Sequence, residues 1–321
     1  MFLVPEREIA GLVTAADCFT AVEKVFASMA RKSAYNFPVI REAIGHADAL
    51  YGFKSGFDRE SLALGLKSGG FWPGNADKGL TNHQSTIFLF DADTGLCRAV
   101  VGGNLLTALR TAAASAVSIR YLARRDAEVL GMVGAGHQSA FQLRAALDQR
   151  DFKKIVGWNI EPRMLGRLDE VARERGIPFE AVELDRLGAE SDVIVTITSS
   201  FHPILKASQV KAGTHLACMG TDTKGKQEVE ADLVAGATVF TDEVAQAVTI
   251  GESQHAVAQG LVAEREIVEL GRVINGDHPG RTSSEEITLF DGTGVGLQDL
   301  AVASAAVDLA IAKGVAIEID F

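Results

Sequence analysis

The glycine-rich segment Gly134–Ser139 carries the clearest chemical signal in the sequence. It follows the apolar run Val129–Val133, which predicts a buried strand, and precedes a run typical of a helix to about residue 148. In this G-x-G-x-x-S pattern, Gly134 allows a tight turn, and Gly136 lets the backbone approach a pyrophosphate that the helix N-terminus attracts. Ser139 replaces the usual third glycine, but a small side chain still permits close helix–strand packing. We therefore predict dinucleotide binding at this turn.

Two basic residues occur where a ligand could bind. In the predicted strand 62–67, alternation places the leucines on one face and Ala63, Gly65 and Lys67 on the other. That second face has little side-chain bulk, so it could form the floor of a ligand cavity; an exposed lysine at a strand end is the alternative. Arg110 lies in the first turns of a predicted helix over 105–124, where the helix dipole disfavours a cation. Its partner could be a buried carboxylate, a substrate or a phosphate, unless it is a plain surface arginine.

Alternating strands and helices in the second half of the chain predict a parallel sheet covered on both faces. The predicted strands are 129–133, 154–158, 179–182, 192–197, 214–218 and 237–240. Asn159 follows the second strand, where an acidic residue normally bonds the ribose hydroxyls, while Glu161 and Arg163 favour NAD and NADP respectively. The fourth and fifth strands run into hydroxyl residues at 196–200 and into Asp222, at the edge where ligands of such sheets bind. Asp222 could equally be a turn or cap residue.

The remaining segments predict a second, discontinuous domain. A strand at 2–4 and a helix capped by Thr14 or Asp17 precede antiparallel strands at 49–53, 62–67, 85–90 and 96–101, the last two joined by a turn at 91–95. After a second glycine-rich turn at 290–296 we expect a helix at 298–313 and a strand at 315–321 that returns to the antiparallel sheet. The fold class is therefore α/β, with a Rossmann domain over 119–298 and an α+β domain formed by 1–118 plus 299–321.

Composition narrows the function classes. The 321 residues suffice for about two domains, and the net charge of −11 argues against a nucleic-acid partner. No apolar run is long enough to span a membrane, and the N-terminus shows no signal pattern. Cys18, Cys97 and Cys218 form no C-x-x-C motif, which fits buried small residues in a reducing cytoplasm. The histidines show no metal-binding spacing, so we expect no metal, and no G-x-S-x-G indicates a serine hydrolase.

Taken together, six segments resemble the ornithine cyclodeaminase/mu-crystallin family over essentially the full length. They are Arg41, Leu64–Lys67, Arg110–Ala113, Val133–Gln138, Met219–Asp222 and Asp291–Asp299. The family includes ornithine cyclodeaminases, alanine dehydrogenases, imine reductases and the lens protein mu-crystallin. Among its members, the chain is most similar in appearance to those that reduce iminosuccinate and to the alanine dehydrogenases. Cyclodeaminases usually continue after the position of Asp222 with Pro-Gly-Lys, whereas this chain has Thr-Lys-Gly-Lys226, which weakens that alternative.

The resemblance implies a different function for each of the two domains. The discontinuous domain binds substrate and forms a homodimer, and the Rossmann domain binds NAD as NADH, with NADP left open. Arg41, Lys67 and Arg110 match the family's substrate-carboxylate clamp, and Lys67 and Asp222 match its catalytic residues. Lys67, crowded by Arg41 and Arg110, is expected to have a lowered pKa suited to proton transfer near neutral pH. A second substrate carboxylate would need a further donor, for which Lys54 and His83 are possible.

The expected activity is hydride transfer to the C=N carbon of a small 2-imino acid, first of all iminosuccinate to L-aspartate. Alanine dehydrogenation, ornithine cyclodeamination and a crystallin-like binding role without turnover are the alternatives, the last disfavoured by the intact Lys67, Arg110 and Asp222. By resemblance, cofactor contacts are expected at Arg110, Thr111, Gly134, Gly136, His137, Gln138, Asn159, Ser199, Met219, Gly220, Thr221 and Gly294.

Overall fold

The computed structural model describes residues 1–320, which form two compact units. Unit 1 consists of Met1–Arg110 together with the segment that begins at Val295, and unit 2 is Thr111–Gly294. The sequence places these boundaries later, at 118 and 298. The units divide instead within helix α3 (Asn104–Leu122) and just before helix α11 (Gly296–Ala312), because Arg110 and the start of α11 are bonded to each other.

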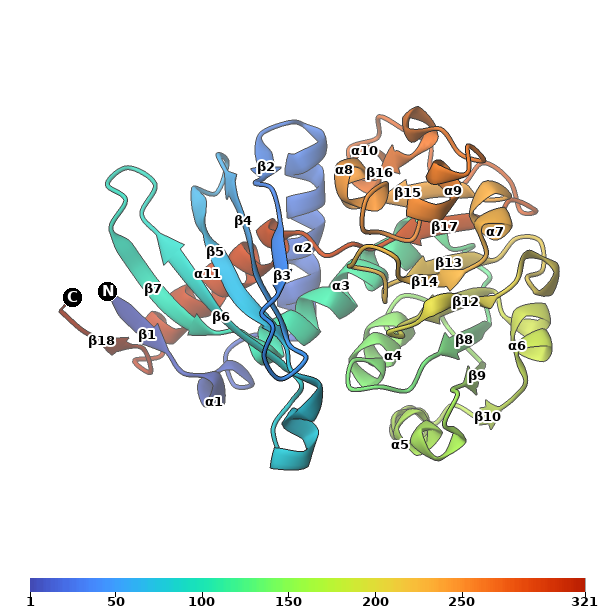
Figure 1. The fold of residues 1–321 in the computed structure, drawn as a ribbon, viewed down its shortest axis with the longest axis horizontal. Coiled ribbons are helices and arrows are strands. Elements are labelled where there is room, and N and C mark those ends of the chain that lie inside the picture. The colour runs from blue at the N-terminus through green and yellow to red at the C-terminus, as the bar shows by residue number, and fades with distance from the viewer. Residues whose placement is uncertain (321) are drawn as a thin grey trace. The chain divides into compact units, whose positions relative to one another are not determined.

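Among the described residues, unit 1 contains one eight-stranded sheet with the spatial order β18-β1-β7-β6-β5-β4-β2, and β3 also pairs with β4 (Figure 1). The strands are β1 (Phe2–Val4), β2 (Ala34–Asn36), β3 (Ile40–Ala43), β4 (Leu50–Asp58), β5 (Ala63–Phe71), β6 (His83–Phe90), β7 (Cys97–Gly102) and β18 (Ile317–Glu318). Neighbouring strands are antiparallel except β1 and β7, which are parallel. The C-terminal strand returns to this sheet beside β1, as predicted.

The helices of unit 1 are α1 (Glu6–Ile9), α2 (Ala15–Ala30), the 3-10 helix η1 (Pro73–Lys78), the first turns of α3, and α11. Helix α2 begins with a capping box: the Thr14 hydroxyl accepts a hydrogen bond from the Asp17 backbone N–H, and the Asp17 carboxylate accepts one from Thr14 N–H. Both candidate caps therefore act together. Val22 and Phe26 lie on the buried face of this helix, which packs against α11.

The small residues of β5 accommodate a helix rather than a ligand. Gly65 lies opposite Gly56 of β4, and added Cβ atoms on these glycines would lie 3.0 Å from side-chain carbons of Leu300 and Leu297 in α11. Helix α11 thus covers this face of the sheet as far as Lys67. The expectation that Ala63 and Gly65 form the floor of a ligand cavity is wrong for these two positions, because the missing side-chain bulk is filled by α11.

Unit 2 is built on a parallel sheet with the order β10-β9-β8-β11-β13-β17-β15-β16. Its strands are β8 (Val129–Val133), β9 (Lys154–Trp158), β10 (Phe179–Ala181), β11 (Val193–Thr196), β13 (His215–Cys218), β15 (Thr238–Thr241), β16 (Val268–Glu269) and β17 (Thr288–Asp291), with β12 (Phe201–Leu205) and β14 (Gln227–Val229) forming a separate pair. The strand order reverses between β8 and β11, as in a Rossmann fold. The predicted fold class is confirmed.

One buried strand of this sheet was not predicted. The segment 290–296 is expected to be a glycine-rich turn, but Phe290 and Asp291 belong to β17, which lies between β13 and β15. A four-residue strand that runs straight into glycines gives little periodicity, which is why the turn signal dominates the sequence pattern. The neighbour of β13 is therefore β17, and the predicted strand at 237–240 lies one position further out.

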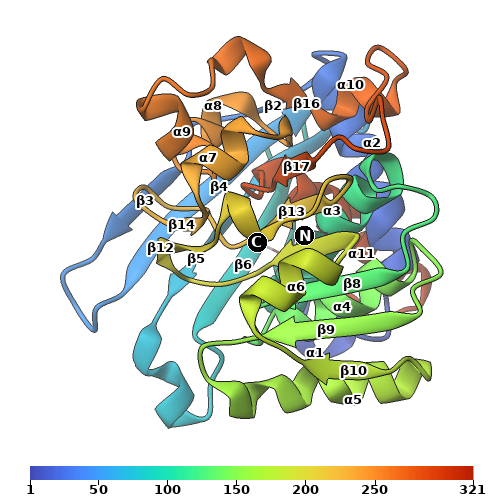
Figure 2. The same cartoon turned by 90° about the vertical axis from the view of Figure 1, so that its right-hand side faces the viewer.

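The remaining elements of unit 2 are short. They are α4 (Ser139–Leu147), η2 (Pro162–Leu165), α5 (Gly166–Arg175), α6 (Leu184–Glu190), η3 (Ala207–Gln209), α7 (Ala231–Ala235), α8 (Val244–Ala247), α9 (Gln254–Ala258), η4 (Glu264–Glu266) and α10 (Leu270–Ile274). Figure 2 shows β8, β9 and β10 side by side, with α5 along the β10 edge. Within residues 1–320, no helix is both long and apolar enough to cross a membrane.

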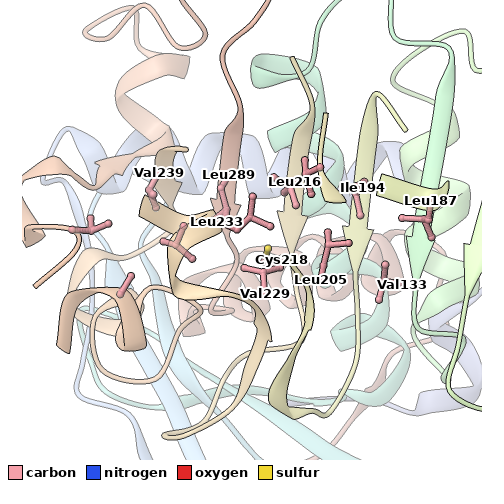
Figure 3. Packing of buried hydrophobic residues seen from close by; sticks show 14 of the residues in the cluster. Val133, Leu187, Ile194, Leu205, Leu216, Cys218, Val229, Leu233, Val239 and Leu289 are labelled. Carbon is pink, nitrogen blue, oxygen red and sulfur yellow. The ribbon is translucent and has the colours of Figure 1, made fainter. Parts of the chain in front are cut away.

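Aliphatic side chains from the parallel strands form the core of unit 2 (Figure 3). Ile194, Leu216 and Leu289 from three adjacent strands are fully buried in it, and Cys218 lies among them. Burial of this kind fixes the register of the strands, because a one-residue slip would turn each apolar side chain to the opposite face. The polar residues that follow the strands are thereby held at one edge of the sheet.

Candidate active site

A buried ionic cluster lies in unit 1 where β5, α3 and α11 meet. The Lys67 ammonium is 2.8 Å from Asp299 Oδ2 and 3.0 Å from Oδ1, and Arg110 Nε donates to Oδ1 at 2.9 Å. Arg110 also donates to Gln298 Oε1 at 3.1 Å. Lys67, Arg110 and Asp299 are 6%, 5% and 0% exposed. Among the three partners that the sequence leaves open for Arg110, the structure contains the buried carboxylate, and a surface arginine is excluded.

Burial and neighbouring charges shift the pKa values in this cluster. Burial, followed by the positive charge of Arg110, lowers the pKa of Lys67 to about 7, although Asp299 opposes the shift. Burial alone would raise the pKa of Asp299, but Arg110 and Lys67 together hold it below its usual value. Asp299 is therefore ionised at neutral pH, while Lys67 can gain or lose a proton there.

The lowered pKa of Lys67 has a different main cause from the one expected. The sequence attributes it to Arg41 and Arg110, whereas burial is the largest contribution, and the further cation that lowers it is Lys54. The strand register explains why, since Lys54 of β4 lies directly opposite Lys67 of β5, while Arg41 of β3 pairs with Gly52 further along. Arg41 shares the same face of the sheet but stands one row away.

His83, from β6, lies in the same electrostatic neighbourhood. Burial, with the positive charges of Lys67 and Arg110, lowers the pKa of His83 to about 3, and Arg41 adds to the effect. The imidazole is therefore neutral in the physiological pH range. A neutral imidazole can donate one hydrogen bond to a ligand but cannot contribute a charge.

Asp299 and Gln298 are functional candidates that the sequence did not single out. Both lie in the first turn of α11 and are fully buried, and Gln298 Nε2 has no hydrogen-bond partner within residues 1–320. A buried amide without a partner is costly unless a ligand or water bonds to it. Two features of the sequence could have identified Asp299: it is an acidic residue at the start of an apolar helix, and Arg110 needs an anionic partner.

The glycine turn of unit 2 has the shape that a pyrophosphate requires. Gly134 adopts a φ of +102°, and an added Cβ would lie 2.6 Å from Ile197 O, so only glycine fits there. An added Cβ on Gly136 meets nothing within 4 Å, so this side of the turn is open. Helix α4 begins at Ser139, whose hydroxyl donates to Gly136 O at 2.8 Å. An open turn followed by a helix N-terminus fits a dinucleotide.

Two side chains hold this turn in place. Asn159 Oδ1 accepts a hydrogen bond from Ala135 N–H at 3.0 Å, and Arg167 donates to Ala135 O at 3.1 Å. Asn159, at the end of β9, thus stabilises the glycine turn. From the sequence, this residue is considered only for binding the ribose. Glu161 and Arg163, which favour opposite cofactors, form an ion pair at 2.7 Å with each other.

Asp222 follows β13 in unit 2 and is partly exposed. Its Oδ1 accepts a hydrogen bond from Lys226 Nζ at 2.9 Å, and Lys226 also donates to Gly220 O at 3.2 Å. The residue is therefore more than a turn former, because its carboxylate is ion-paired within its own loop. Lys226 is the last residue of the segment that departs from the cyclodeaminase pattern.

Buried carboxylates fix the loops at this edge, and none of them was expected from the sequence. Glu228 accepts hydrogen bonds from Thr196 Oγ1, Thr198 N and Gly220 N at 2.6, 2.6 and 2.8 Å. Burial raises the pKa of Glu228, and burial with the charge of Glu228 raises that of Glu252, the partner of Thr221 Oγ1, to about 8. The loops after β11 and β13 are thus tied together by one side chain.

The other expected cofactor positions lie at strand ends or on helices of unit 2, except Arg110 of unit 1. His137 and Ser199 are exposed, Gln138 precedes α4, and Thr111 is buried in α3. Met219 follows β13, and Gly294 has a φ of +74° and donates to Asp242 at 2.8 Å. The structure therefore gathers one group of candidates around Lys67 in unit 1 and another along the carboxyl edge of unit 2, and Asp222 belongs to the second.

An open glycine turn at the carboxyl edge of a parallel sheet, in a chain that also contains a second sheet-based unit, defines a Rossmann-type α/β protein. A family model matches residues 3–314, and its description is the ornithine cyclodeaminase/mu-crystallin family. The chain belongs to this family, which confirms the resemblance noted in the sequence.

Individual relatives resemble the chain over its whole length. The iminosuccinate reductase of Paracoccus denitrificans is 66% identical over 320 residues, with all of both chains covered. The crystal structure of that enzyme in complex with NAD+ has a TM-score of 0.96 and covers 100% of this chain and 99% of its own. An archaeal alanine dehydrogenase dimer with bound NAD is 31% identical, with a TM-score of 0.93 and coverage of 100% and 99%.

Proposed function

We propose that this protein is an NAD-dependent reductase that converts iminosuccinate to L-aspartate. The observation that carries the chemistry is the buried cluster of Lys67, Arg110 and Asp299, because it combines a cationic anion-binding site with a group that titrates near neutral pH. The 66% identity to an iminosuccinate reductase across the whole chain supports the choice of substrate.

In the proposed reaction, Arg41 and Arg110 bind the substrate carboxylate next to the imine carbon, and protonated Lys67 supplies a proton for the imine nitrogen. Proton transfer makes the imine a better electrophile. The nicotinamide cofactor, when bound, supplies the hydride that the imine carbon accepts, so that C=N becomes CH–NH. Asp299 orients the Lys67 and Arg110 side chains, and Asp222 is proposed to bond the substrate nitrogen or balance its charge.

We further propose NAD as the cofactor, held at the glycine turn and along the carboxyl edge of unit 2. The fit rests on Gly136, where the turn is open, and on the helix that starts at Ser139. Arg163, the residue that would attract the 2′-phosphate of NADP, is ion-paired with Glu161. The NAD+ complex of the Paracoccus relative supports the same choice. We also propose that NAD is contacted by the individual residues between Thr111 and Gly294 that the resemblance implies as cofactor contacts.

A spectrophotometric assay tests the proposed function. NADH oxidation is followed with oxaloacetate plus ammonia, which equilibrate with iminosuccinate, and with pyruvate plus ammonia beside it. We expect oxidation that requires ammonia and prefers oxaloacetate. A preference for pyruvate would instead make the protein an alanine dehydrogenase. No oxidation with either substrate, using NADH or NADPH, would overturn the reductase function and leave ornithine with ammonia release as the next assay.

We also propose that the protein is a homodimer formed through the sheet of unit 1. On the face away from α11, apolar side chains form a continuous patch of half-buried or exposed residues, which we call the outer face: Tyr35, Phe53, Phe57, Leu64, Leu66, Phe88, Phe90 and Val100. Contiguous apolar surface of this kind marks protein–protein interfaces. The archaeal alanine dehydrogenase is a dimer. Three free cysteines and the metabolic substrate fit a cytoplasmic enzyme.

Replacing Phe88 by aspartate is expected to convert the dimer to a monomer, because a carboxylate would then be buried without a partner at the centre of the outer face. Sedimentation velocity at several protein concentrations measures the result. The matched control is Leu261→Asp, which alters an exposed side chain of unit 2 (44% exposed) and should leave the dimer intact. A Phe88→Asp variant that still sediments as a dimer would place the interface elsewhere.

A further inference from the structure

Three buried carboxylates connect the loops of unit 2 in series. Asp291, the last residue of β17, accepts a hydrogen bond from the backbone N–H of Glu252 at 2.9 Å. Glu252 Oε1 in turn accepts from the backbone N–H groups of Glu228 and Val229 in β14, at 2.8 Å each. None of the three carboxylic residues is more than 1% exposed. Each carboxylate thus holds the backbone of the next segment, and Glu228 is the last in the series.

Glu228 holds the two loops that contain proposed cofactor contacts. Its carboxylate bonds to the backbone of Thr198, after β11, and of Gly220, after β13. An added Cβ on Gly220 would lie 2.4 Å from Glu228 Oε1, so the loop packs directly against the carboxylate. Ser199 and the residues 219–221 belong to these loops. The position of these contacts therefore depends on Glu228.

Uncharged groups supply the hydrogen bonds that these three carboxylates accept. The donors are backbone N–H groups and the hydroxyls of Thr196, Thr221 and Ser253. Within residues 1–320, no basic side chain forms an ion pair with any of the three. Neighbouring buried anions repel each other when no cation lies between them, so a proton on one of them lowers the energy of the group.

The pattern of donors shows which carboxylates are ionised. Glu228 receives a backbone N–H on each of its oxygens, from Thr198 on Oε1 and from Gly220 on Oε2. Asp291 likewise accepts one backbone N–H on Oδ1 and another on Oδ2. A protonated carboxyl group is itself a donor at one oxygen, so a proton on either residue would meet an N–H that cannot accept it. Both are therefore ionised.

Glu252 has room for the proton. Both of its backbone donors bond to Oε1, and within the described residues Oε2 bonds only to Thr221 Oγ1, at 2.5 Å. A hydroxyl both donates and accepts, so a proton on Oε2 can be donated to Thr221 without loss of any other hydrogen bond. The pKa of Glu252, which burial and the charge of Glu228 raise to about 8, agrees with this placement.

We propose that ionised Glu228 is a positioning residue for the nicotinamide cofactor and that a proton on Glu252 Oε2 preserves the arrangement of the two loops. This inference rests on the proposed cofactor site and names the side chains that keep its loops in place. Glu228 acts through the backbone of Thr198 and Gly220. Without its charge, one of these N–H groups loses its acceptor, and NADH must order the loops when it binds.

Replacing Glu228 by glutamine is expected to raise the Kd of NADH about 10- to 100-fold, because the amide nitrogen leaves one buried backbone N–H without an acceptor. Fluorescence titration measures Kd, and KM for NADH should rise with it. The value of kcat at saturating NADH should stay nearly constant, since Lys67 and Arg110 belong to unit 1. If Glu228→Gln fails to fold, Thr196→Val removes one donor to Glu228 at nearly constant size and should weaken NADH binding in the same direction.

Asp192→Asn is the matched control for Glu228→Gln. Asp192 is also a buried carboxylate of unit 2 that accepts two backbone N–H groups, from Glu128 and Val129, but it lies at the amino ends of β8 and β11. Its replacement should lower the melting temperature and leave the Kd of NADH unchanged. An unchanged Kd in Glu228→Gln, or an equal rise in both variants, would overturn the proposal.

The proton on Glu252 is tested by the pH dependence of NADH binding. Titratable groups of the neighbouring segments are Glu228 of β14, Asp291 of β17, Cys218 of β13, Asp222 and Lys226 of the loop after β13, and His255 of α9. Lys226 is paired with Asp222, and burial raises the pKa of the Cys218 thiol, so the thiol is neutral. Loss of the Glu252 proton therefore adds a second negative charge beside Glu228.

The Kd of NADH in wild type should consequently rise as pH increases through about 8, by no more than about tenfold per pH unit for a single proton. Glu252→Gln should lose this rise, because glutamine reproduces the hydrogen-bonding pattern of protonated glutamate and does not titrate. A wild-type Kd that is constant between about pH 7 and pH 9 would overturn the placement of the proton. A rise that persists in Glu252→Gln would do the same, since another group would then titrate.

NADH binding separates this inference from the proposed function. If wild type fails to reduce oxaloacetate with ammonia but its NADH binding depends on Glu228 as described, the proposed function alone fails. If wild type reduces oxaloacetate with ammonia and the Kd of NADH is the same in Glu228→Gln, this inference alone fails.

Discussion

Replacing Lys67 by alanine is expected to lower kcat for imine reduction by about 10²- to 10⁴-fold, the usual loss when a positioned proton donor is removed. The fold should survive, because Asp299 keeps its 2.9 Å hydrogen bond from Arg110 when the ammonium is lost. NADH binding should be nearly unchanged, since the glycine turn that is proposed to hold the cofactor belongs to unit 2. Steady-state kinetics and a fluorescence titration with NADH measure the two quantities on one preparation.

Lys24→Ala is the matched control for this prediction, because it removes an exposed lysine from α2 in the same unit. Its kinetics should equal those of wild type. Simultaneous loss of turnover and NADH binding in Lys67→Ala would mean that the residue supports the structure rather than the reaction. A Lys67→Ala variant that reduces imine at the wild-type rate would contradict the role proposed for the ammonium.

The sequence predicts the Rossmann unit well because each of its signals is local. A buried strand, a glycine turn and a helix start are all encoded within about twenty residues. The structure contains each of them, as β8, the turn at Gly134 and α4. The return of the C-terminal strand to the first sheet was also expected, because the segment 315–321 is predicted to be a strand that pairs with the antiparallel sheet. Strand β17 was missed because its four residues run straight into glycines and give little periodicity.

The candidate site was predicted in part for the same reason. Lys67 and Arg110 were singled out by their places on a strand and a helix, both readable from nearby residues. Asp299, however, lies 232 residues from Lys67 in the sequence, and only the packing of α11 on β4 and β5 brings the carboxylate to the ammonium. Glu228 is a similar case, because its three partners come from two strand ends that sequence periodicity cannot join.

The glycines of β5 show how one pattern supports two interpretations. Missing side-chain bulk at Gly65 is compatible with a ligand or with a closely packed helix, and the sequence contains no feature that distinguishes them. Leu297 and Leu300 decide the matter in favour of α11.

Replacing Asp299 by asparagine is expected to move the pH dependence of catalysis rather than only to weaken it. Asp299 raises the pKa of Lys67, so loss of its charge should lower that pKa below the wild-type value of about 7. If protonated Lys67 is the proton donor, activity is present below the Lys67 pKa and falls as pH rises through it. The basic limb of kcat/KM should therefore lie near pH 7 in wild type and at lower pH in Asp299→Asn.

Because the cluster is buried, Asp299→Asn should also lower the stability of the protein, and a control must separate this loss from the shift in pH dependence. Removing one partner of a buried ion pair typically lowers the free energy of unfolding by about 3–5 kcal/mol, so the Asp299→Asn variant should unfold at a lower temperature. Lower stability by itself reduces the amount of active enzyme equally at every pH within the folded range, whereas a lowered Lys67 pKa shifts the limb. The control is Asp308→Asn. Asp308 lies on α11, as Asp299 does, but it is exposed and pairs with Arg98, so its replacement should leave the basic limb of the pH profile unchanged. An Asp299→Asn profile with an unshifted basic limb would show that a group other than Lys67 donates the proton.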